Sequence, residues 1–489
     1  MLHTITSTPD RLRLRLRKLM ARPQRHRLLH GYPLAAAMPY ADGDVRQRAA
    51  HGDGEFRLPP NPASELLVGV LPHPFCNPKI QGCGFCTFPH ETFNAIKSGA
   101  LVHAVMKEIS DRQGPQSDTT NAQIAGLYFG GGTANLTPPA LFRSLARQLS
   151  ETFDVSRAEV SLEGVPAYFV RSQPLLVDVM QEELPARHFR ISMGIQTFSE
   201  RRLEQMGRLA FGRPDTFAAA VQIAHQRGMT SSGDLLFNLP GQSLEEMHDD
   251  VRRAIDIGLD QICLYHLVMF RGLGTVWSQN DELLSALPGN DEAADNWLAL
   301  REYLIANGFR QTTLTNFERN ELANDARRYR YELMSFEPDS YQMLGYGPAG
   351  ISYTSAPDGS YALKTMNPES SAEYLQAIRG TGSAWNRYFQ YDVEDLKVLH
   401  LTRRVAALGI EKERFQKSFG FRAWDGYSEC LAMLIEEGLL TESEKAFTLT
   451  PRGMFFADSV AGFLAARRLQ ERYNRQYVES KNDNGGGHM

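Results

Sequence analysis

Short apolar runs alternate with amphipathic segments along the middle of the chain, between about residues 66 and 320. Apolar runs bounded by turn residues predict buried strands, and segments with helical spacing predict helices. The predicted strands are residues 67–72, 124–129, 159–164, 189–195, 231–240 and 261–268, and the predicted helices are 95–112, 138–153, 214–228 and 243–258. Strands and helices that alternate in this way are typical of βαβ units and of a parallel sheet.

Six such units predict an α/β fold, namely a partial or complete (β/α) barrel of the TIM type. The chemistry of such a barrel lies at the carboxyl ends of its strands, and a cysteine-containing loop follows the first predicted strand there. A helix–strand pair at 289–315 and a glycine-rich loop at 343–353 are expected to close the barrel region.

The pattern divides the chain into four parts. Residues 1–65 are predicted to form a basic, solvated helical arm followed by a polar linker. We expect the barrel domain at 66–385 and a small, α-rich, winged-helix-like domain at 386–477. The polar tail at 478–489 is predicted to be disordered.

Composition and charge narrow the class of protein. Apolar content of 42% and charged content of 22% are ordinary for a soluble globular protein, and a net charge of −5 creates no general attraction for nucleic acid. No apolar run is long enough to span a membrane. Five cysteines, an odd number, do not suggest a disulfide framework, so we expect a reducing, cytoplasmic location without nucleic-acid or membrane partners.

Three of the five cysteines, Cys76, Cys83 and Cys86, lie within eleven positions of one loop. A structural zinc site normally has four ligands, and here His73 or His90 would have to supply the fourth. The alternative is an iron–sulfur cluster, in which three thiolates would hold three irons and leave the fourth iron open to a small molecule.

This loop resembles the signature of the radical S-adenosylmethionine (SAM) superfamily, although Cys-x6-Cys-x2-Cys replaces the usual Cys-x3-Cys-x2-Cys. The resemblance implies that Cys76, Cys83 and Cys86 are both the metal ligands and the catalytic centre. It also implies a [4Fe–4S] cluster whose open iron chelates SAM.

Further motifs follow in the family's order. The sequence "YFGGGTANLT" is similar to the family's glycine motif and implies SAM binding at Gly131, Gly132 and Thr133. Its Tyr-x-Gly-Gly-Gly-Thr form resembles the branch of oxygen-independent coproporphyrinogen oxidase, which also contains heme chaperones and class C methyltransferases. The sequence "SLEG" resembles the strand whose glutamate binds SAM, which implies the same role for Glu163.

A second SAM molecule is implied by later motifs of the same branch. The segment "RISMGIQTF" and its continuation place Gln196 and Arg208, "GDLLFNLPGQ" carries Asp234, and "YHLV" ends at Val268. Taken singly, Glu163 and Asp234 could instead cap helices or form salt bridges, and Arg208 could cover a helix end.

Three departures from the branch bear on the reaction. Val70 stands where the coproporphyrinogen oxidases have a tyrosine, and Phe88 stands where they have a fourth cysteine. The histidine and cysteine pattern of the heme chaperones after the barrel is replaced by "NDARRYRYELMSF" at 324–336.

The resemblance therefore implies a radical SAM enzyme that cleaves SAM to a 5′-deoxyadenosyl radical. With a second SAM as donor, the expected reaction is C-methylation or cyclopropanation of an sp² carbon in a small-molecule natural product. The alternatives are coproporphyrinogen oxidation or oxidative heme breakdown and, outside enzymes, a heme chaperone. The expected partners are a small-molecule substrate and a flavodoxin- or ferredoxin-type electron donor, and a separate methyltransferase could act with the protein.

Overall fold

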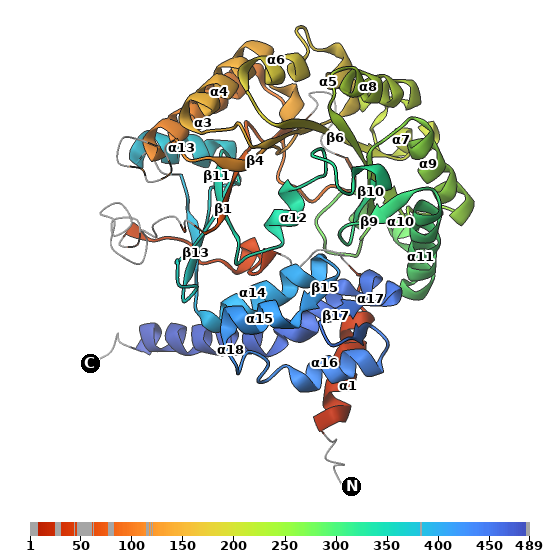
Figure 1. Cartoon of the computed structure of the whole chain (residues 1–489), viewed down its shortest axis with the longest axis vertical. Helices are drawn as coiled ribbons and strands as arrows, with labels where there is room; N and C mark the ends of the chain where they lie inside the picture. Colours follow the sequence, from red (N-terminus) through yellow and green to blue (C-terminus); the bar gives the residue numbers. More distant parts are fainter. Residues whose placement is uncertain are drawn as a thin grey trace.

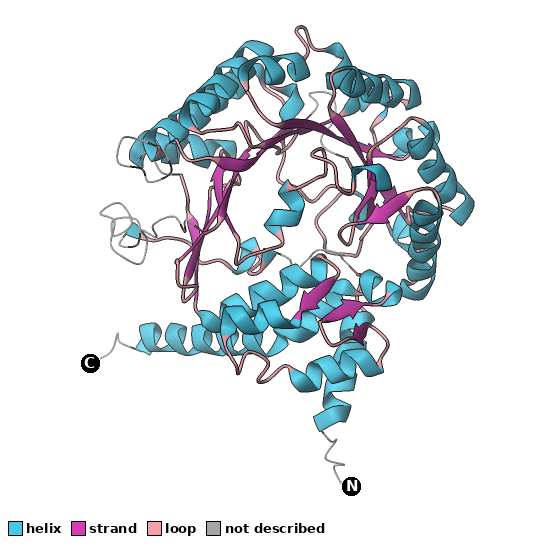
Figure 2. Ribbon diagram, viewed as in Figure 1, coloured by secondary structure: helices cyan, strands magenta, loops and turns pink. Residues whose placement is uncertain are grey.

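The structure is a computed structural model that describes residues 8–24, 31–43, 45, 61, 63–76, 83–113, 117, 119, 121–381 and 384–485. Its centre is a curved sheet that opens toward a helical domain, with helices covering the outside of the curve (Figures 1 and 2). No helix in the described ranges is both long enough and apolar enough to pass through a lipid bilayer.

Six parallel strands form the middle of the sheet, in the order β1-β4-β5-β6-β7-β8. Their bounds are Glu65–Val70 (β1), Ile124–Phe129 (β4), Glu159–Gly164 (β5), His188–Gln196 (β6), Thr230–Phe237 (β7) and Gln261–His266 (β8). All six strands expected from the apolar runs are confirmed, as is their parallel pairing. Since each strand is followed by a crossover helix, their carboxyl ends share one edge of the sheet.

The described residues add three strands beyond β11 on one side and two beyond β8 on the other. Strand β11 (Tyr341–Tyr346) pairs parallel to β1 and is followed by antiparallel β12 (Ile351–Ser355), β13 (Ala362–Met366) and β14 (Arg387–Tyr391). On the other side, β10 (Asn316–Arg319) and β9 (Phe309–Gln311) are antiparallel. The two edges of the sheet, β14 and β9, do not pair with each other, so the barrel is partial.

The prediction of a glycine-rich loop at 343–353 is wrong, because this segment contains most of β11 and the start of β12. A Cβ atom on Gly345 would lie 2.2 Å from the carbonyl oxygen of Ile351. The glycine therefore permits a tight strand connection, and a glycine-rich sequence alone does not distinguish such a connection from an open loop.

Some of the outer helices begin with a side-chain cap. Asn94 accepts a hydrogen bond from the backbone N–H of Lys97 at the start of α3, and Ser243 forms a capping box with Glu246 at the start of α9. The helices of the barrel domain are α3 (Ala95–Arg112), α4 (Pro139–Thr152), α5 (Pro166–Arg171), α6 (Leu176–Glu183), α7 (Glu200–Gln205), α8 (Pro214–Gln226), α9 (Leu244–Asp256), α10 (Asp281–Ser285), α11 (Asn290–Ala306) and α13 (Ser371–Thr381).

One short helix, α12 (Tyr331–Ser335), lies inside the ring of strands (Figure 1). Its Tyr331 ring lies 5.1 Å from the ring of Tyr128 on β4. A Cβ atom on Gly126 would lie 2.8 Å from the same Tyr331 ring. The glycine in β4 thus leaves the space in which the internal helix packs.

The C-terminal domain packs across the open side of the barrel (Figure 1). It contains α14 (Val393–Ala406), α15 (Lys412–Phe419), α16 (Ser428–Glu436), α17 (Pro451–Phe455) and α18 (Ala457–Gly485), with a three-stranded sheet of β15 (Gly409–Glu411), β16 (Leu440–Glu442) and β17 (Ala446–Leu449). Helix α18 reaches Gly485 and therefore enters the segment for which the sequence predicts a disordered tail; residues 486–489 lie outside the described ranges.

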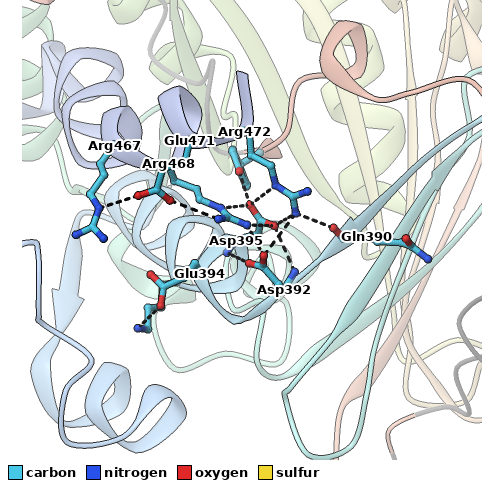
Figure 3. A network of polar contacts seen from close by, with 10 residues as sticks. Gln390, Asp392, Glu394, Asp395, Arg467, Arg468, Glu471 and Arg472 are labelled. Atoms are coloured by element: carbon cyan, nitrogen blue, oxygen red, sulfur yellow. Dashed lines mark hydrogen bonds and ion pairs between the residues drawn. The ribbon is translucent and has the colours of Figure 1, made fainter. Parts of the chain in front are cut away.

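The N-terminal segment differs from a solvated arm. Helix α1 (Thr8–Met20) packs on the C-terminal domain, with Leu16 fully buried and Arg13 hydrogen-bonded to Glu437 at 3.0 Å. Tyr32 then reaches Asp395, whose buried carboxylate also accepts hydrogen bonds from Arg468 and Arg472 of α18 (Figure 3). This network joins the first and last segments of the chain.

Candidate active site at the mouth of the barrel

The three cysteines of the loop each lie at the carboxyl ends of the strands: Cys76 beside Gly132, Cys83 beside Arg208, and Cys86 on the wall of a cleft. Cys76 ends the short strand β2 (Phe75–Cys76), which pairs with β3 (Glu91–Thr92), and the backbone N–H of Cys86 donates to the carbonyl of Cys83 at 2.9 Å. Burial raises the pKa of Cys76 to about 11, and the thiols of Cys86 and Cys83 contribute to this rise.

The zinc alternative is not supported by His73. The ring of His73 accepts from the backbone N–H of Phe75 at 3.3 Å and contacts the Thr137 hydroxyl at 3.2 Å, so both of its nitrogens have protein partners. Burial lowers the pKa of His73 to about 4. Among the described residues, no three His, Cys, Asp or Glu side chains are arranged to hold a single metal ion.

The residues present do fit an iron–sulfur cluster. Thiolates are the ligands that such clusters use, and the predicted glycine turn after β4 lies directly against the first thiol. The Cys76 sulfur lies 3.4 Å from the carbonyl oxygen of Gly132, and Thr133 donates its hydroxyl to that sulfur at 3.6 Å. A Cβ atom on Gly132 would lie 2.4 Å from the Pro74 carbonyl, and Gly131 has a φ of 117°. Only glycine permits this close approach of the two backbones.

A cleft of about 600 Å³ opens beside the cysteine turn. Four of the residues predicted to bind SAM line it together with Cys86: they are Glu163, Gln196, Asp234 and Val268. The remaining lining is largely apolar and includes Phe85, Phe88, Leu236 and Leu267. The sequence-predicted residues, which come from four different strand ends, are thus brought to one surface beside Cys86, which the sequence predicts to be a cluster ligand.

Glu163 carries a half-buried carboxyl group with a tyrosine partner. Tyr128 donates its hydroxyl to Oε2 of Glu163 at 2.9 Å. Burial raises the pKa of Glu163 to about 7, and the neighbouring Asp234 carboxylate contributes to the rise. Glu163 lies on β5 itself, which argues against the alternative of a helix cap.

Gln196 and Arg208 approach each other around Gly194. Gln196 has a φ of 72°, in the left-handed region that non-glycine residues rarely adopt, and the register with β7 shifts between Gly194 and Gln196. A Cβ atom on Gly194 would lie 2.9 Å from Nε2 of Gln196 and 3.1 Å from the guanidinium of Arg208. Backbone strain of this kind clusters at functional sites.

The structure places Arg208 against the cysteine turn. Its guanidinium donates to the sulfur of Cys83 at 2.9 Å and to the carbonyl oxygen of Gly194, and it lies over the ring of Phe211. Arg208 is not among the residues that line the 600 Å³ cleft. Its expected role at a second SAM stays a prediction.

A smaller polar chamber of about 270 Å³ lies deeper in the barrel and shares Glu163, Asp234 and Tyr265 with the cleft. The buried Arg190 lines it, donating from Nε to Gln261 at 2.6 Å and lying 3.8 Å from the ring of Tyr329. The sequence analysis assigned no role to Arg190, Tyr128 or Tyr329. The signal for Arg190 was the row of polar residues at every second position of β6, but the tyrosine of the loop before α12 had none.

The histidine of β8 lies at the edge of the cleft. His266 contacts the amide nitrogen of Asn238 through Nδ1 at 3.1 Å, and its ring packs between Phe237 and Phe455. Burial lowers its pKa to about 4, so the ring is neutral near pH 7. Through Phe455, the C-terminal domain contributes to the wall behind the cleft.

Two separate parts of the chain match known protein families. Residues 70–254 match the family described as "Radical SAM superfamily", and residues 407–456 match the "HemN C-terminal domain". The first match contains the cysteine loop and the predicted SAM-binding residues up to Asp234. The second lies within the domain that covers the open side of the barrel.

Similar proteins carry names connected with heme. The chain is 23% identical over 397 residues to "Heme chaperone HemW" of Bacillus subtilis, covering 80% of this chain and 96% of the relative. It is 30% identical over 195 residues to "Anaerobilin synthase" of Escherichia coli O157:H7, covering 40% and 41%. The solved structure of coproporphyrinogen III oxidase (HemN) from Escherichia coli, at 18% identity, aligns with a TM-score of 0.70 over 88% of this chain and 96% of that one, which supports the fold.

Proposed function

Because the chain belongs to the HemN-like branch of the radical SAM superfamily, we propose that it is a SAM-cleaving radical enzyme that acts on a tetrapyrrole. Membership of the superfamily implies a [4Fe–4S] cluster and SAM. The observation that carries the proposal is the single cleft in which Cys86 and the predicted SAM-binding residues meet. A second SAM molecule that would act as a methyl donor is kept only as an alternative within this proposal.

In this proposal Cys76, Cys83 and Cys86 hold the cluster as thiolates. Burial raises the pKa values of Cys76 and Cys86, so protons would leave these two thiols when the metal binds. A cluster held by these three thiolates and reduced by an external electron donor would supply the electron for the reductive cleavage of SAM. The chain itself supplies the position and the enclosure of the reacting groups.

Glu163 is suited to hold a hydroxyl-bearing group such as a ribose. Its carboxyl group is oriented by Tyr128 and lies at the junction of the cleft and the inner chamber. A carboxyl group with a pKa of about 7 can accept or donate a hydrogen bond near neutral pH. With a substrate bound, the aromatic and aliphatic lining beside it would limit the access of water, which protects reactive intermediates from side reactions.

A tetrapyrrole suits the apolar side of the cleft. Phe85, Phe88, Leu236 and Leu267 offer a surface on which a flat macrocycle can stack. The names of the relatives support this substrate class, since they refer to heme, anaerobilin and coproporphyrinogen. None of these names supports methylation or cyclopropanation of a natural product, which the sequence analysis put first.

The test is anaerobic incubation of reconstituted, reduced protein with hemin, or with coproporphyrinogen, and SAM carrying a deuterated methyl group. We expect 5′-deoxyadenosine to form at a rate that rises with the tetrapyrrole, together with a change in tetrapyrrole mass. Deuterium transfer from the methyl group into 5′-deoxyadenosine without any change in tetrapyrrole mass would overturn the proposal in favour of two-SAM methyl transfer to another substrate. If the rate of SAM cleavage is the same with and without either tetrapyrrole, the proposed substrate class is wrong.

A heme chaperone is the second candidate, favoured by the name and near full-length coverage of HemW. A chaperone would retain hemin on a sizing column and leave its mass unchanged, whether or not SAM and reductant are present. Mass spectrometry of the retained tetrapyrrole therefore separates the two candidates.

A further inference from the structure

The cysteine motif of this chain has two halves that are anchored separately. The first half, Cys76, belongs to the β2–β3 pair and contacts Gly132 and Thr133. Six residues separate it from the second half, the turn from Cys83 to Cys86. A longer spacer leaves more conformations open to the two halves, so bringing their thiols to one cluster costs more conformational entropy.

The second half is held by a distant segment, the 3₁₀ turn at Trp277–Gln279. The backbone N–H of Trp277 donates to the carbonyl of Gly84 at 2.8 Å, and the Trp277 ring lies 5.9 Å from the ring of Phe85. A Cβ atom on Gly84 would lie 2.2 Å from Cδ1 of Trp277, so the indole occupies the space that any larger side chain at position 84 would need.

The turn that carries Trp277 is itself well braced. Thr275 and Ser278 are buried, the backbone N–H of Thr275 donates to the Ser278 hydroxyl at 3.0 Å, and that hydroxyl donates to the carbonyl of Thr275 at 2.7 Å. Val276, next to Trp277, is 72% exposed. The segment therefore presents its tryptophan to the cysteine turn and its valine to solvent.

We propose that Trp277 is the positioning residue of the cluster turn: it holds Cys83 and Cys86 in place relative to Cys76, the constraint that a shorter spacer would otherwise provide. The indole acts through the backbone of Gly84 and the ring of Phe85, and it does not ligate the cluster. The inference rests on the cluster being held by these three thiols and is independent of the tetrapyrrole substrate.

The test compares Trp277→Ala, Trp277→Phe and the neighbouring control Val276→Ala after anaerobic reconstitution. Iron and sulfide per chain are measured during challenge with a chelator, with the electron paramagnetic resonance spectrum of the reduced protein recorded with and without SAM. Substitution of residues that support metal ligands typically lowers metal affinity by about 10- to 100-fold. We expect iron loss to be at least roughly 10-fold faster in Trp277→Ala and near the wild-type rate in the other two.

A double-mutant cycle with Gly84→Ala separates a specific contact from general instability. We expect Gly84→Ala alone to lose iron quickly, because its methyl group pushes against the indole. Combined with Trp277→Ala it should be no worse than Trp277→Ala alone, since the obstacle is gone. Thermal unfolding of the iron-free variants checks that they fold.

Three results would overturn the proposal. They are equal iron retention in Trp277→Ala and Val276→Ala, additive losses in the double mutant, or an unchanged spectrum and retention in Gly84→Ala. The last decides the question even if Trp277→Ala does not fold. Hemin binding and SAM cleavage are scored separately, so a failed proposal about the tetrapyrrole leaves these results intact.

Discussion

Asp395, buried in the C-terminal domain, and Glu163, half-buried at the barrel mouth, are both carboxyl groups, and their surroundings shift their pKa values in opposite directions. Burial alone would raise the pKa of Asp395, but hydrogen bonds from Arg468, Arg472 and Tyr32 outweigh it and leave the pKa well below its ordinary value (Figure 3). Around Glu163, burial and the Asp234 carboxylate outweigh the one bond from Tyr128 and raise the pKa to about 7.

The difference separates a structural group from a functional one. The Asp395 carboxylate is fully charged and fully paired, so it ties helix α18 and Tyr32 to α14 and has no capacity left for a ligand. Glu163 lines a cleft, has one neutral donor and lies near a second acid. A carboxyl group like Glu163, whose pKa is raised and which lines a cleft, marks a candidate site. A carboxyl group like Asp395, whose pKa is lowered by arginine partners, marks a structural ion-pair network.

The largest loss of stability is expected on replacing Asp395, whose charge has the most ion-pair partners of the two carboxyl groups. Replacing Asp395 with alanine removes the buried carboxylate that Arg468 and Arg472 share and leaves them with their ion pairs to Asp392 and Glu471. Breaking a buried ion pair typically costs about 3–5 kcal/mol of unfolding free energy. Denaturant unfolding of the variant measures this. The control is Glu394→Ala on the same helix, an exposed residue paired with Lys397, for which we expect a change within about 0.5 kcal/mol. Equal losses in both variants would contradict the comparison.

The next effect concerns SAM binding at the barrel mouth. Glu163→Gln keeps the shape of the side chain and removes its charge, and a hydrogen bond to a charged group is worth about 1.5–3 kcal/mol, or roughly 10- to 100-fold in affinity. Anaerobic equilibrium binding of SAM to the reconstituted protein checks it. The matched control is Glu159→Gln. Glu159 is a buried glutamate four residues earlier on the same strand, and it does not line the cleft. An equal loss in the control would remove Glu163 from the site.

The contributions of the two carboxyl groups to the free energy of unfolding should also change with pH in opposite directions. Glu163 keeps its proton in the folded protein between about 4.5 and 7, where the unfolded chain has lost it, so its contribution falls as pH rises through this window. Asp395 contributes above its ordinary value of 3.8, and its contribution is lost as pH falls below it. Urea unfolding at several pH values should show a flatter response between about 4.5 and 7 in Glu163→Gln than in wild type. An unchanged slope would mean that Glu163 is not the titrating group.

The smallest effect is expected from the partner of Glu163. Tyr128→Phe removes the hydroxyl that stabilises the carboxylate, so the pKa of Glu163 should rise further and the unfolding free energy should fall by about 1 kcal/mol. Infrared difference spectroscopy of the carboxyl stretch against pH measures the first change. A pKa that stays at or moves below its wild-type position would show that Tyr128 does not set the charge of this group.

Much of the fold was determined by local patterns in the sequence. Apolar runs predict the six central strands because a parallel sheet buries both faces of each strand, and this constraint acts residue by residue. The ordered motifs from Cys76 to Asp234 likewise predict the superfamily, since each occupies the carboxyl end of a strand whose position the pattern already indicates. The predictions failed where packing outweighed local signals, as in the strands β11 and β12 and in the N-terminal helix that lies on the C-terminal domain.

Only the tertiary structure decided which residues meet. The contact between Trp277 and Gly84 joins positions 193 residues apart, and no local pattern in the chain records it. The same holds for Tyr331 inside the barrel and for Arg208 beside Cys83. Propensity and periodicity act over a few neighbouring residues, whereas a binding cleft is formed by strand ends whose spacing is set by the hydrogen bonds of the whole sheet.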